Sequence, residues 1–378
     1  MIPRQVTHLI QGKLGTKKAI ILLGPRQVGK TTLLKELVHS NNWNVLWING
    51  DDFDVNQMLA NLNAEKWKSL IGKNSVVIVD EAQRIHDIGL KLKILTDQLS
   101  DIQVIVSGSS SLEIAQKVNE PLTGRKWEYQ MFPLCFQEMV NYHGLITEKR
   151  LIPKRLIFGY YPDVVNHPDD SIETLKQLAS SYLYKDLLSL DQVRNSDLVV
   201  NLLRALAFQI GSQVSYHELS QMLGVDTKTI EKYINLLEQS FVIFRLGSFS
   251  QNLRNELKKS KKIYFFDVGM RNAIINNFLP LESRNDSGVL WENFIIMERI
   301  KFLHYHRRHV NQWFWRTKEQ KEIDLIEEEN GELRAFEFKN SGVSTGKIPG
   351  LFLKSYPNSK TEIITPENIE EFILPGKW

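Results

Sequence analysis

The chain has 378 residues, more than one hydrophobic core usually supports, so we expect two or three domains of roughly 100 to 200 residues each. A hydrophobic content of 42% and a charged content of 24% are typical of a folded, soluble protein, and a net charge of +3 is too small to identify an anionic partner. The single cysteine, Cys135, excludes an internal disulfide and favours a reducing compartment, so a cytoplasmic protein is expected.

A glycine-rich loop follows the first apolar run. Residues 19–23 (AIILL) predict a buried strand, and residues 31–38 have the apolar spacing of a helix that packs on a sheet. Glycines 24 and 29 let the backbone curl, so that consecutive amides at the start of the helix point at a β-phosphate. Lys30 would contact the β- and γ-phosphates, and the Thr31 hydroxyl would bind Mg²⁺. The residues expected to bind the nucleotide are Gly24, Pro25, Arg26, Gln27, Val28, Gly29, Lys30, Thr31 and Thr32.

Asp80 and Glu81 end a second apolar run, residues 75–79 (SVVIV). An aspartate at such a strand tip can hold Mg²⁺ through its water shell, so Asp80 and Thr31 are the expected metal residues. The adjacent glutamate can polarise the attacking water, which makes Glu81 the expected base. A solvated strand end is the alternative for an isolated Asp-Glu pair, but this pair follows the glycine loop by about fifty residues.

Two more strands complete the predicted sheet. Residues 44–49 (NVLWIN) form one, and residues 102–106 (IQVIV) form another that ends at Ser107. If this last strand lies between the first two, Ser107 could sense the γ-phosphate; a plain Gly-Ser turn is the alternative. At least four strands alternating with helices predict an α/β fold, a parallel sheet with helices on both faces.

Arg125 follows this nucleotide core. Its guanidinium could reach phosphate charge in its own subunit or in a neighbour's, and only the second role needs a homo-oligomer. A surface arginine is the alternative reading.

These motifs resemble a known family, the prokaryotic AAA-like P-loop ATPases of the additional-strand class. The matching segments are GPRQVGKTT (24–32), VDEAQ (79–83), SGSSS (107–111), LTGRK (122–126), FPLCFQE (132–138) and YYPDVV (160–165). The resemblance extends to about Ser341 and implies an ATPase core, a winged-helix-like middle and a carboxyl-terminal DUF4143-type domain of the restriction-endonuclease type. The choice of ATP over GTP also rests on it.

The middle of the chain has a helix, helix, turn, helix pattern of its own. Residues 202–210, 216–223 and 227–237 have helical apolar spacing, and strand-like runs follow at 241–246 and 263–266. The runs flank a lysine cluster that a basic wing would use to contact phosphates, formed by Lys258, Lys259, Lys261 and Lys262. The leading face of the helix that begins at 227 would present Lys228, Thr229 and Lys232 to a major groove. A module for protein contact is the alternative, because Glu231 dilutes the positive charge.

Four side chains in the carboxyl-terminal region could converge. Residues 288–300 predict a helix that carries Glu292, and strands are predicted at 313–316, 323–326 and 333–338. Asp324 lies in the second strand, and Glu337 and Lys339 are two positions apart, so they face the same side of the sheet. Two carboxylates can hold Mg²⁺ against a phosphodiester while a lysine stabilises negative charge. The pattern resembles nucleases with an aspartate followed by Glu-x-Lys; ordinary salt-bridged strands, or an inert nuclease fold, are the alternatives.

We therefore expect four parts: a P-loop ATPase domain (1–140), a helical linker or lid (141–195), a winged-helix-like region (196–270) and a restriction-endonuclease-like α/β domain (271–378). The expected function is ATP hydrolysis with Mg²⁺, coupled to DNA binding or to the nuclease-like domain. A nucleotide-controlled DNA- or protein-binding switch with an inactive scaffold is the alternative. No membrane partner is expected, because no apolar stretch reaches the roughly 18 residues of a membrane helix.

Overall fold

The computed structural model describes residues 2–109, 122–182, 195–250, 261–317, 319–340 and 348–376. They form two compact units, one of Met1–Pro133 with Gln239–Phe241 and one of Leu134–Glu238 with Val242–Trp378. Within these described ranges, no helix combines the length and apolar character that crossing a lipid bilayer requires.

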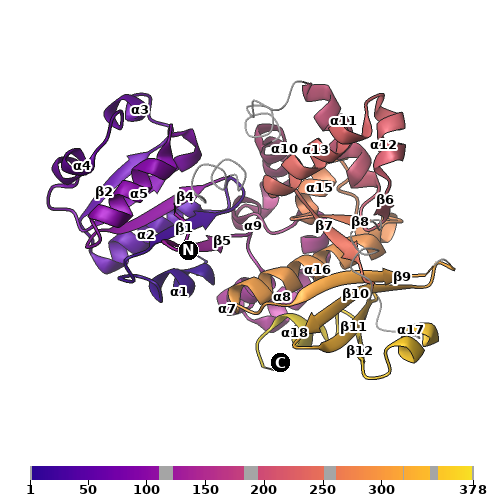
Figure 1. Ribbon diagram of the computed structural model, residues 1–378. Helices are drawn as coiled ribbons and strands as arrows, with labels where there is room; N and C mark the ends of the chain where they lie inside the picture. Colours follow the sequence, from indigo (N-terminus) through magenta and orange to yellow (C-terminus); the bar gives the residue numbers. More distant parts are fainter. Residues whose placement is uncertain are drawn as a thin grey trace. The chain divides into compact units, whose positions relative to one another are not determined.

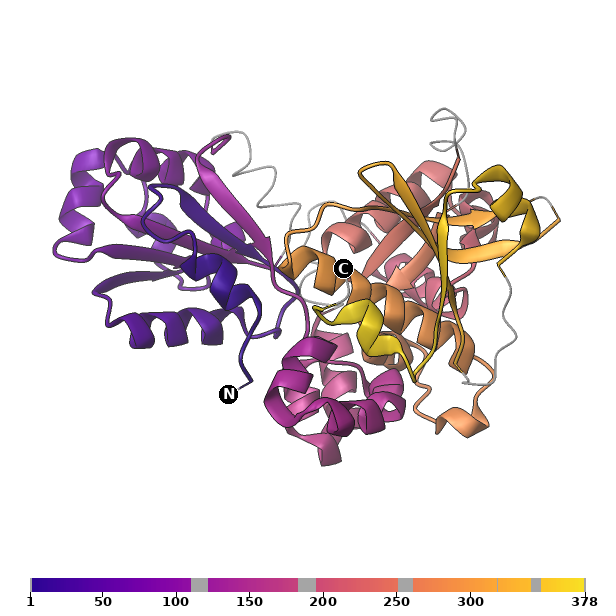
Figure 2. The same cartoon turned by 90° about the horizontal axis from the view of Figure 1, so that it is seen from below.

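The first unit is built on a five-stranded sheet in which every strand runs parallel to its neighbours (Figure 1). The strand order is β2-β3-β4-β1-β5, and helices cover both faces of the sheet (Figure 2). The strands are β1 (Ala19–Leu23), β2 (Val45–Asn49), β3 (Val76–Asp80), β4 (Gln103–Gly108) and β5 (Lys126–Gln130). The helices are α1 (Val6–Gln11), α2 (Lys30–Asn41), α3 (Val55–Met58), α4 (Ala64–Ile71), the 3₁₀ helix η1 (Ala82–Arg84) and α5 (Ile88–Gln98).

The parallel sheet predicted from the sequence is confirmed, and β4 does lie between β1 and β3. β1 and β3 are buried along their whole length, which explains their unbroken apolar runs, since a strand covered on both faces has no polar side. The fifth strand, β5, was not predicted. It lies at the edge of the sheet, and its sequence KWEYQ is polar because most of its side chains are only partly covered.

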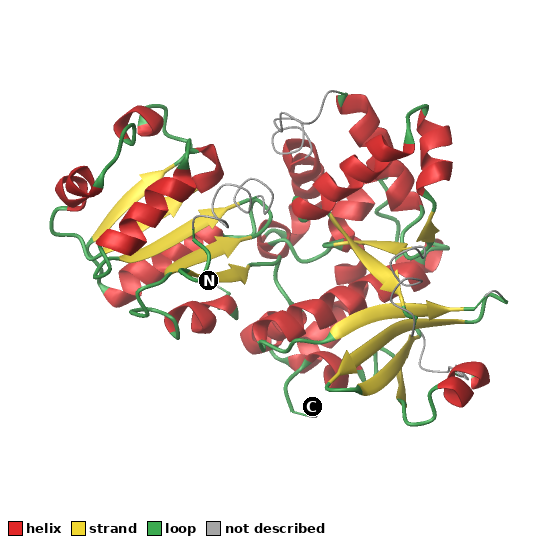
Figure 3. Cartoon of the chain, in the orientation of Figure 1, coloured by secondary structure: helices red, strands yellow, loops and turns green. Residues whose placement is uncertain are grey.

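The second unit holds a seven-stranded sheet and a larger set of helices (Figure 3). Its first part contains α7 (Phe136–His143), α8 (Leu145–Phe158), α9 (Pro162–Asn166), η2 (Pro168–Asp170), α10 (Ser171–Tyr182), α11 (Ser196–Phe208), β6 (Gln213–Val214), α12 (Tyr216–Leu223), α13 (Thr227–Gln239) and β7 (Ile243–Ser248). The rest contains β8 (Lys261–Phe265), α15 (Val268–Ile274), η4 (Leu281–Ser283), α16 (Ser287–Tyr305), β9 (Asn311–Arg316), β10 (Glu322–Glu329), β11 (Glu332–Phe338), α17 (Gly350–Ser355), β12 (Lys360–Ile364) and α18 (Ile369–Ile373).

The sheet of the second unit runs continuously from the middle of the chain to its carboxyl-terminal region. Its order is β12-β11-β10-β9-β7-β8-β6. The two strand-like runs predicted around the lysine cluster are β7 and β8, displaced by one or two residues, and they pair with each other in antiparallel register. β7 also pairs in parallel with β9, through Gly247 and Trp313, so the two strands are not a separate hairpin. The winged-helix assignment and the four domain boundaries stay predictions.

Candidate functional site

The glycine loop lies between β1 and α2, at the carboxyl edge of the first sheet. A Cβ atom on Gly24 would lie 2.1 Å from the carbonyl oxygen of Met131, so only glycine fits there. Gly29 begins α2 with a φ of 94°, the left-handed region that favours glycine. Both glycines therefore serve the curled backbone that the sequence predicts.

Lys30 lies inside the curl of this loop. Its Nζ donates hydrogen bonds to the carbonyl oxygens of Gly24 and Pro25, each at 2.7 Å, and the side chain is buried. Among the other predicted nucleotide-binding residues the exposure differs. Pro25 and Val28 are buried, Arg26 and Thr31 are partly covered, and Gln27 and Thr32 are exposed.

Asp80 brings two hydroxyl groups together at the ends of three strands. The Thr31 hydroxyl donates to Asp80 Oδ2 at 2.7 Å, and the Ser107 hydroxyl donates to Asp80 Oδ1. Asp80 and Ser107 are both buried. The strand order explains the contact: β4 separates β1 from β3, so Ser107, next to the last residue of β4, lies between the loop and Asp80.

Glu81 is held by a residue that sequence analysis missed, Gln83. The Gln83 Nε2 group donates to Glu81 Oε2 at 2.6 Å and to the Ser109 hydroxyl at 2.9 Å. The backbone of Glu81 is left-handed, with a φ of 50°, and its carbonyl oxygen lies so close to Gly50 that a Cβ there would approach within 2.2 Å. The glutamine in the VDEAQ segment was the available signal for this role.

Arg4 is a second residue that the motifs do not reveal. Its guanidinium donates to the carbonyl oxygens of Val28, in the loop, and Phe132, which follows β5, each at 2.6 Å. The side chain is buried, so one cation near the amino terminus fixes the glycine loop to the segment after the last strand. No sequence motif marks such a support.

Arg125 lies at the opposite end of the strands from the glycine loop, where β1 begins. Its carbonyl oxygen accepts a hydrogen bond from the amide of Ala19, the first residue of β1, whereas the loop follows the last residue of that strand. Its guanidinium pairs with Asp97 at the surface. The structure does not bring Arg125 to Lys30 within one chain, and a role toward the nucleotide of a neighbouring copy stays a prediction.

The four residues predicted in the carboxyl-terminal region do come together. Pairing of Leu325 with Phe336 aligns β10 and β11, and Asp324 Oδ2 accepts a hydrogen bond from the amide of Phe338 at 2.8 Å. Burial, together with the negative charges of Glu292 and Glu337, raises the pKa of Asp324 to about 8.

Glu337 has one oxygen paired and one oxygen open. Lys339 Nζ donates to Glu337 Oε1 at 2.6 Å. Glu337 Oε2 is buried and has no hydrogen-bond partner among the residues that the structure describes. An acceptor in that state is costly unless a cation or a proton satisfies it.

Glu292 is engaged by residues that sequence analysis did not place here. Lys262 Nζ donates to Glu292 Oε1 at 2.8 Å, and the Tyr264 hydroxyl donates to the same oxygen at 2.5 Å. Lys262 also pairs with Glu322, whose carboxylate lies within 4.8 Å of those of Glu292 and Asp324. Lys262 and Tyr264 are two apart on β8, so both face the cluster.

The prediction that Lys262 belongs to a basic wing that contacts phosphates is therefore wrong. Its side chain is only 2% exposed, because it points into the carboxylate cluster rather than toward a phosphate backbone. Lys258 and Lys259 lie outside the described residues. On α13, Lys228 and Lys232 are exposed as predicted, whereas the Thr229 hydroxyl donates to Asp226 at 2.7 Å.

We predict that Arg4→Met weakens nucleotide binding at least tenfold. The change leaves the carbonyl oxygens of Val28 and Phe132 without this buried donor, which costs about 1–3 kcal/mol per group and loosens the loop. Isothermal titration with ATP measures the effect. Arg84→Met, which removes a half-exposed arginine paired with Asp51, is the control and should bind as the wild type does. Equal affinity of the Arg4 variant would contradict the assigned role.

Comparison with known proteins agrees with the geometry of the first unit. Residues 16–140 match the model of an AAA domain. Residues 149–281 and 287–368 match two domains of unknown function, DUF8612 and DUF4143.

Two relatives that match most of this chain are described as uncharacterized proteins. One from Mycobacterium tuberculosis is 26% identical over 89% of this chain and 74% of its own length. One from Haemophilus influenzae is 24% identical over 100% of this chain and 96% of its own. The replication factor C large subunit of Methanosarcina acetivorans is 30% identical over 20% of this chain and 13% of its own.

A solved structure of Bacteroides Pif1 bound to single-stranded DNA covers 41% of this chain and 49% of its own at 15% identity. Its TM-score is 0.25, too low to support any inference. The family matches agree with the strand order and with the contacts around Asp80. The chain therefore carries an AAA domain of the P-loop ATPase type, followed in the same polypeptide by a DUF4143 domain.

Proposed function

We propose that this protein binds ATP with Mg²⁺ at the glycine loop and hydrolyses it. The observation that supports the proposal is the convergence of Thr31 at the start of α2 with Asp80 at the end of β3 and Ser107 in β4, with Glu81 next in sequence to Asp80. Carboxylate and hydroxyl oxygens are ligands that Mg²⁺ prefers, so Thr31 and Asp80 fit the ion. When bound, the ion would neutralise charge on the β- and γ-phosphates.

The residues of the chain would divide the remaining work. Lys30 and the amides at the start of α2 would bind the phosphates. The Glu81 carboxylate would accept a hydrogen bond from the attacking water and take its proton. The water oxygen would bond to the γ-phosphorus as the bond from that phosphorus to the bridging oxygen breaks, which gives ADP and phosphate. Gln83 would orient the Glu81 carboxylate, since it donates to one of its oxygens.

We predict that Glu81→Gln lowers Mg²⁺-dependent phosphate release by about 10²–10⁴-fold while ATP still binds, because only the proton acceptor is removed. Lys30→Ala should lose both binding and turnover. Phosphate release from wild type and each variant, with and without duplex or single-stranded DNA, measures this. If wild type binds ATP without releasing phosphate, the nucleotide-controlled switch replaces the hydrolase. If Lys30→Ala turns over normally, the site lies elsewhere.

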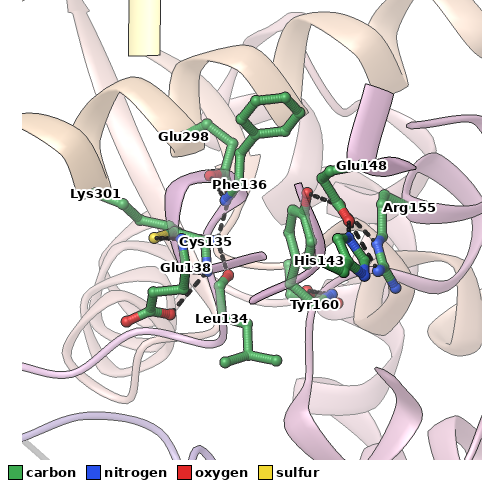
Figure 4. Close-up of polar contacts among 11 residues, drawn as sticks. Leu134, Cys135, Phe136, Glu138, His143, Glu148, Arg155, Tyr160, Glu298 and Lys301 are labelled. Atoms are coloured by element: carbon green, nitrogen blue, oxygen red, sulfur yellow. Dashed lines mark hydrogen bonds and ion pairs between the residues drawn. The ribbon is translucent and has the colours of Figure 1, made fainter. Parts of the chain in front are cut away.

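We also propose that the nucleotide state is coupled to the second unit through the connecting segment, residues 131–136. Its first end lies against the loop: the amide of Met131 donates to Leu23 at 2.7 Å, and the Met131 carbonyl lies against Gly24. Its other end is held by α16. Lys301 Nζ donates to the carbonyl of Leu134 at 2.9 Å, and the amide of Phe136 donates to Glu298 at 2.6 Å (Figure 4).

Helix α16 makes this coupling specific. Lys301 and Glu298 pair with each other at 2.6 Å and are buried, so the connecting segment is fixed to the helix by charged groups rather than by apolar contact alone. The same helix presents Glu292 to the carboxylate cluster two turns earlier. A shift of the loop on ATP binding would thus act on α16 through three intervening peptide bonds.

We predict that Glu298→Gln/Lys301→Met uncouples the two units. The pair of changes leaves an oxygen for the amide of Phe136 and avoids an unpaired buried charge. In Glu81→Gln protein, ATP should change hydrogen exchange of α16 at least severalfold, and the double change should abolish that response at unaltered ATP affinity. Lys149→Met/Glu370→Gln removes an ion pair between α8 and α18 and is the control. A full response of α16 in the uncoupled variant would sink the proposal.

A second function, metal-dependent phosphodiester cleavage, is favoured by the open, buried oxygen of Glu337 beside Asp324 and Lys339. The donor set of two carboxylates fits Mg²⁺. When bound, the ion would polarise the phosphodiester. Lys339, held at this place by its hydrogen bond to Glu337, would stabilise negative charge on the phosphodiester. Burial lowers the pKa of Lys339, but the hydrogen bond to Glu337 and the nearby carboxylates outweigh it and raise this pKa overall.

We predict that Asp324→Asn abolishes Mg²⁺-dependent nicking of supercoiled plasmid, at least 10²-fold, because metal catalysis supplies several kcal/mol. Glu319→Gln changes an exposed carboxylate of the same unit and should nick as the parent does. Nicking that survives in Asp324→Asn would mean that this cluster is not its source. A parent without nicking activity would favour the inert scaffold.

A further inference from the structure

Lys262 is a buried lysine surrounded by carboxylates. It lies on β8, and its ammonium contacts Glu292 at 2.8 Å and Glu322. Carboxylate oxygens of Glu292, Glu322 and Asp324 lie within 4.8 Å of one another, a spacing that would otherwise suit a divalent cation. The question is which cation this cluster uses.

The ammonium is well placed to be that cation. Tyr264 donates at 2.5 Å to the same Glu292 oxygen as Lys262 does, so that oxygen already has two donors. Burial lowers the pKa of Lys262, but the charges of Glu292, Glu322 and Asp324 outweigh it and hold this pKa above its ordinary value. The ion pairs with Glu292 and Glu322 therefore place a cation of the chain itself inside the cluster.

The lysine comes from a different part of the chain than the carboxylates. Glu292, Glu322 and Asp324 lie in the DUF4143 match, residues 287–368, whereas Lys262 and Tyr264 lie in the DUF8612 match, residues 149–281. The cluster is thus completed by β8, which reaches it through the pairing of β7 with both β8 and β9.

We propose that the Lys262 ammonium is the resident cation of this cluster and takes the position of a divalent metal ion between Glu292 and Glu322. These two glutamates then bind the lysine and no metal. If the proposed cleavage operates, its metal is confined to Asp324 and Glu337, and Lys262 supplies a positive charge in addition to that of Lys339. The assignment of Lys262 itself does not depend on cleavage activity.

This assignment is tested by counting the Mn²⁺ ions that the full chain binds in the absence of nucleotide. Titration followed by electron paramagnetic resonance gives that number. Lys262→Met should bind one more Mn²⁺ than wild type, and Lys262→Met/Glu322→Gln should lose the extra ion. At Mn²⁺ about 100-fold above its Kd, the midpoint of thermal unfolding of Lys262→Met should rise on the order of 5–10 °C more than that of wild type. Lys301→Met, which removes a buried lysine paired with a single glutamate of α16, is the matched control and should gain no ion.

The single variant Glu322→Gln provides a second test, which does not depend on whether Lys262→Met folds. The proposal expects the wild-type number of bound Mn²⁺ ions in this variant. Fewer ions would show that metal displaces the lysine and would overturn the proposal, as would a folded Lys262→Met that gains no site. Loss of plasmid nicking, by contrast, bears only on the proposed cleavage.

Discussion

The order of the three inner strands, β3-β4-β1, is the constraint on which the nucleotide site depends. The carboxyl ends of these parallel strands lie at one edge of the sheet, so the loop after β1, Asp80 at the end of β3 and Ser107 in β4 meet there without any long side chain. The carboxylate of Asp80 then joins the two hydroxyls. Two further side chains refine this arrangement: Arg4, outside the motifs, holds the loop, and Gln83, at the end of the VDEAQ segment, orients Glu81.

Most of the first unit could be predicted because its strands are buried on both faces and therefore read as continuous apolar runs. The edge strand β5 escaped for the opposite reason, since its partly covered residues leave no apolar run. Arg4 escaped because its contacts with Val28 and Phe132 are distant in sequence, and no local spacing encodes them. Gln83 lies inside the VDEAQ segment, but the sequence does not show that its amide reaches both Glu81 and Ser109.

In the second unit, spacing predicted the convergence of Glu292, Asp324, Glu337 and Lys339 but not the side chains that surround them. The lysines near β8 look alike in sequence, and a surface wing was the simplest interpretation. The burial of Lys262 depends on β7 joining β9, a pairing between distant strands. Charge alone therefore gave the wrong environment for this lysine, and the strand predicted at 263–266 began one residue after it, whereas β8 includes it.

That same pairing has a consequence for how the chain folds. Gly247 meets Trp313 only after 66 further residues have been made, so β7, β8 and β6 have an open strand edge while α16 is still being synthesised. Pairing between distant strands is slow, because the closure of a long loop precedes any contact that rewards it. Unpaired edges at that stage favour association with other chains. During synthesis on the ribosome we therefore expect the second unit to fold late and to be prone to aggregation. The yield of folded second unit should depend on chaperones more than the yield of folded AAA domain does.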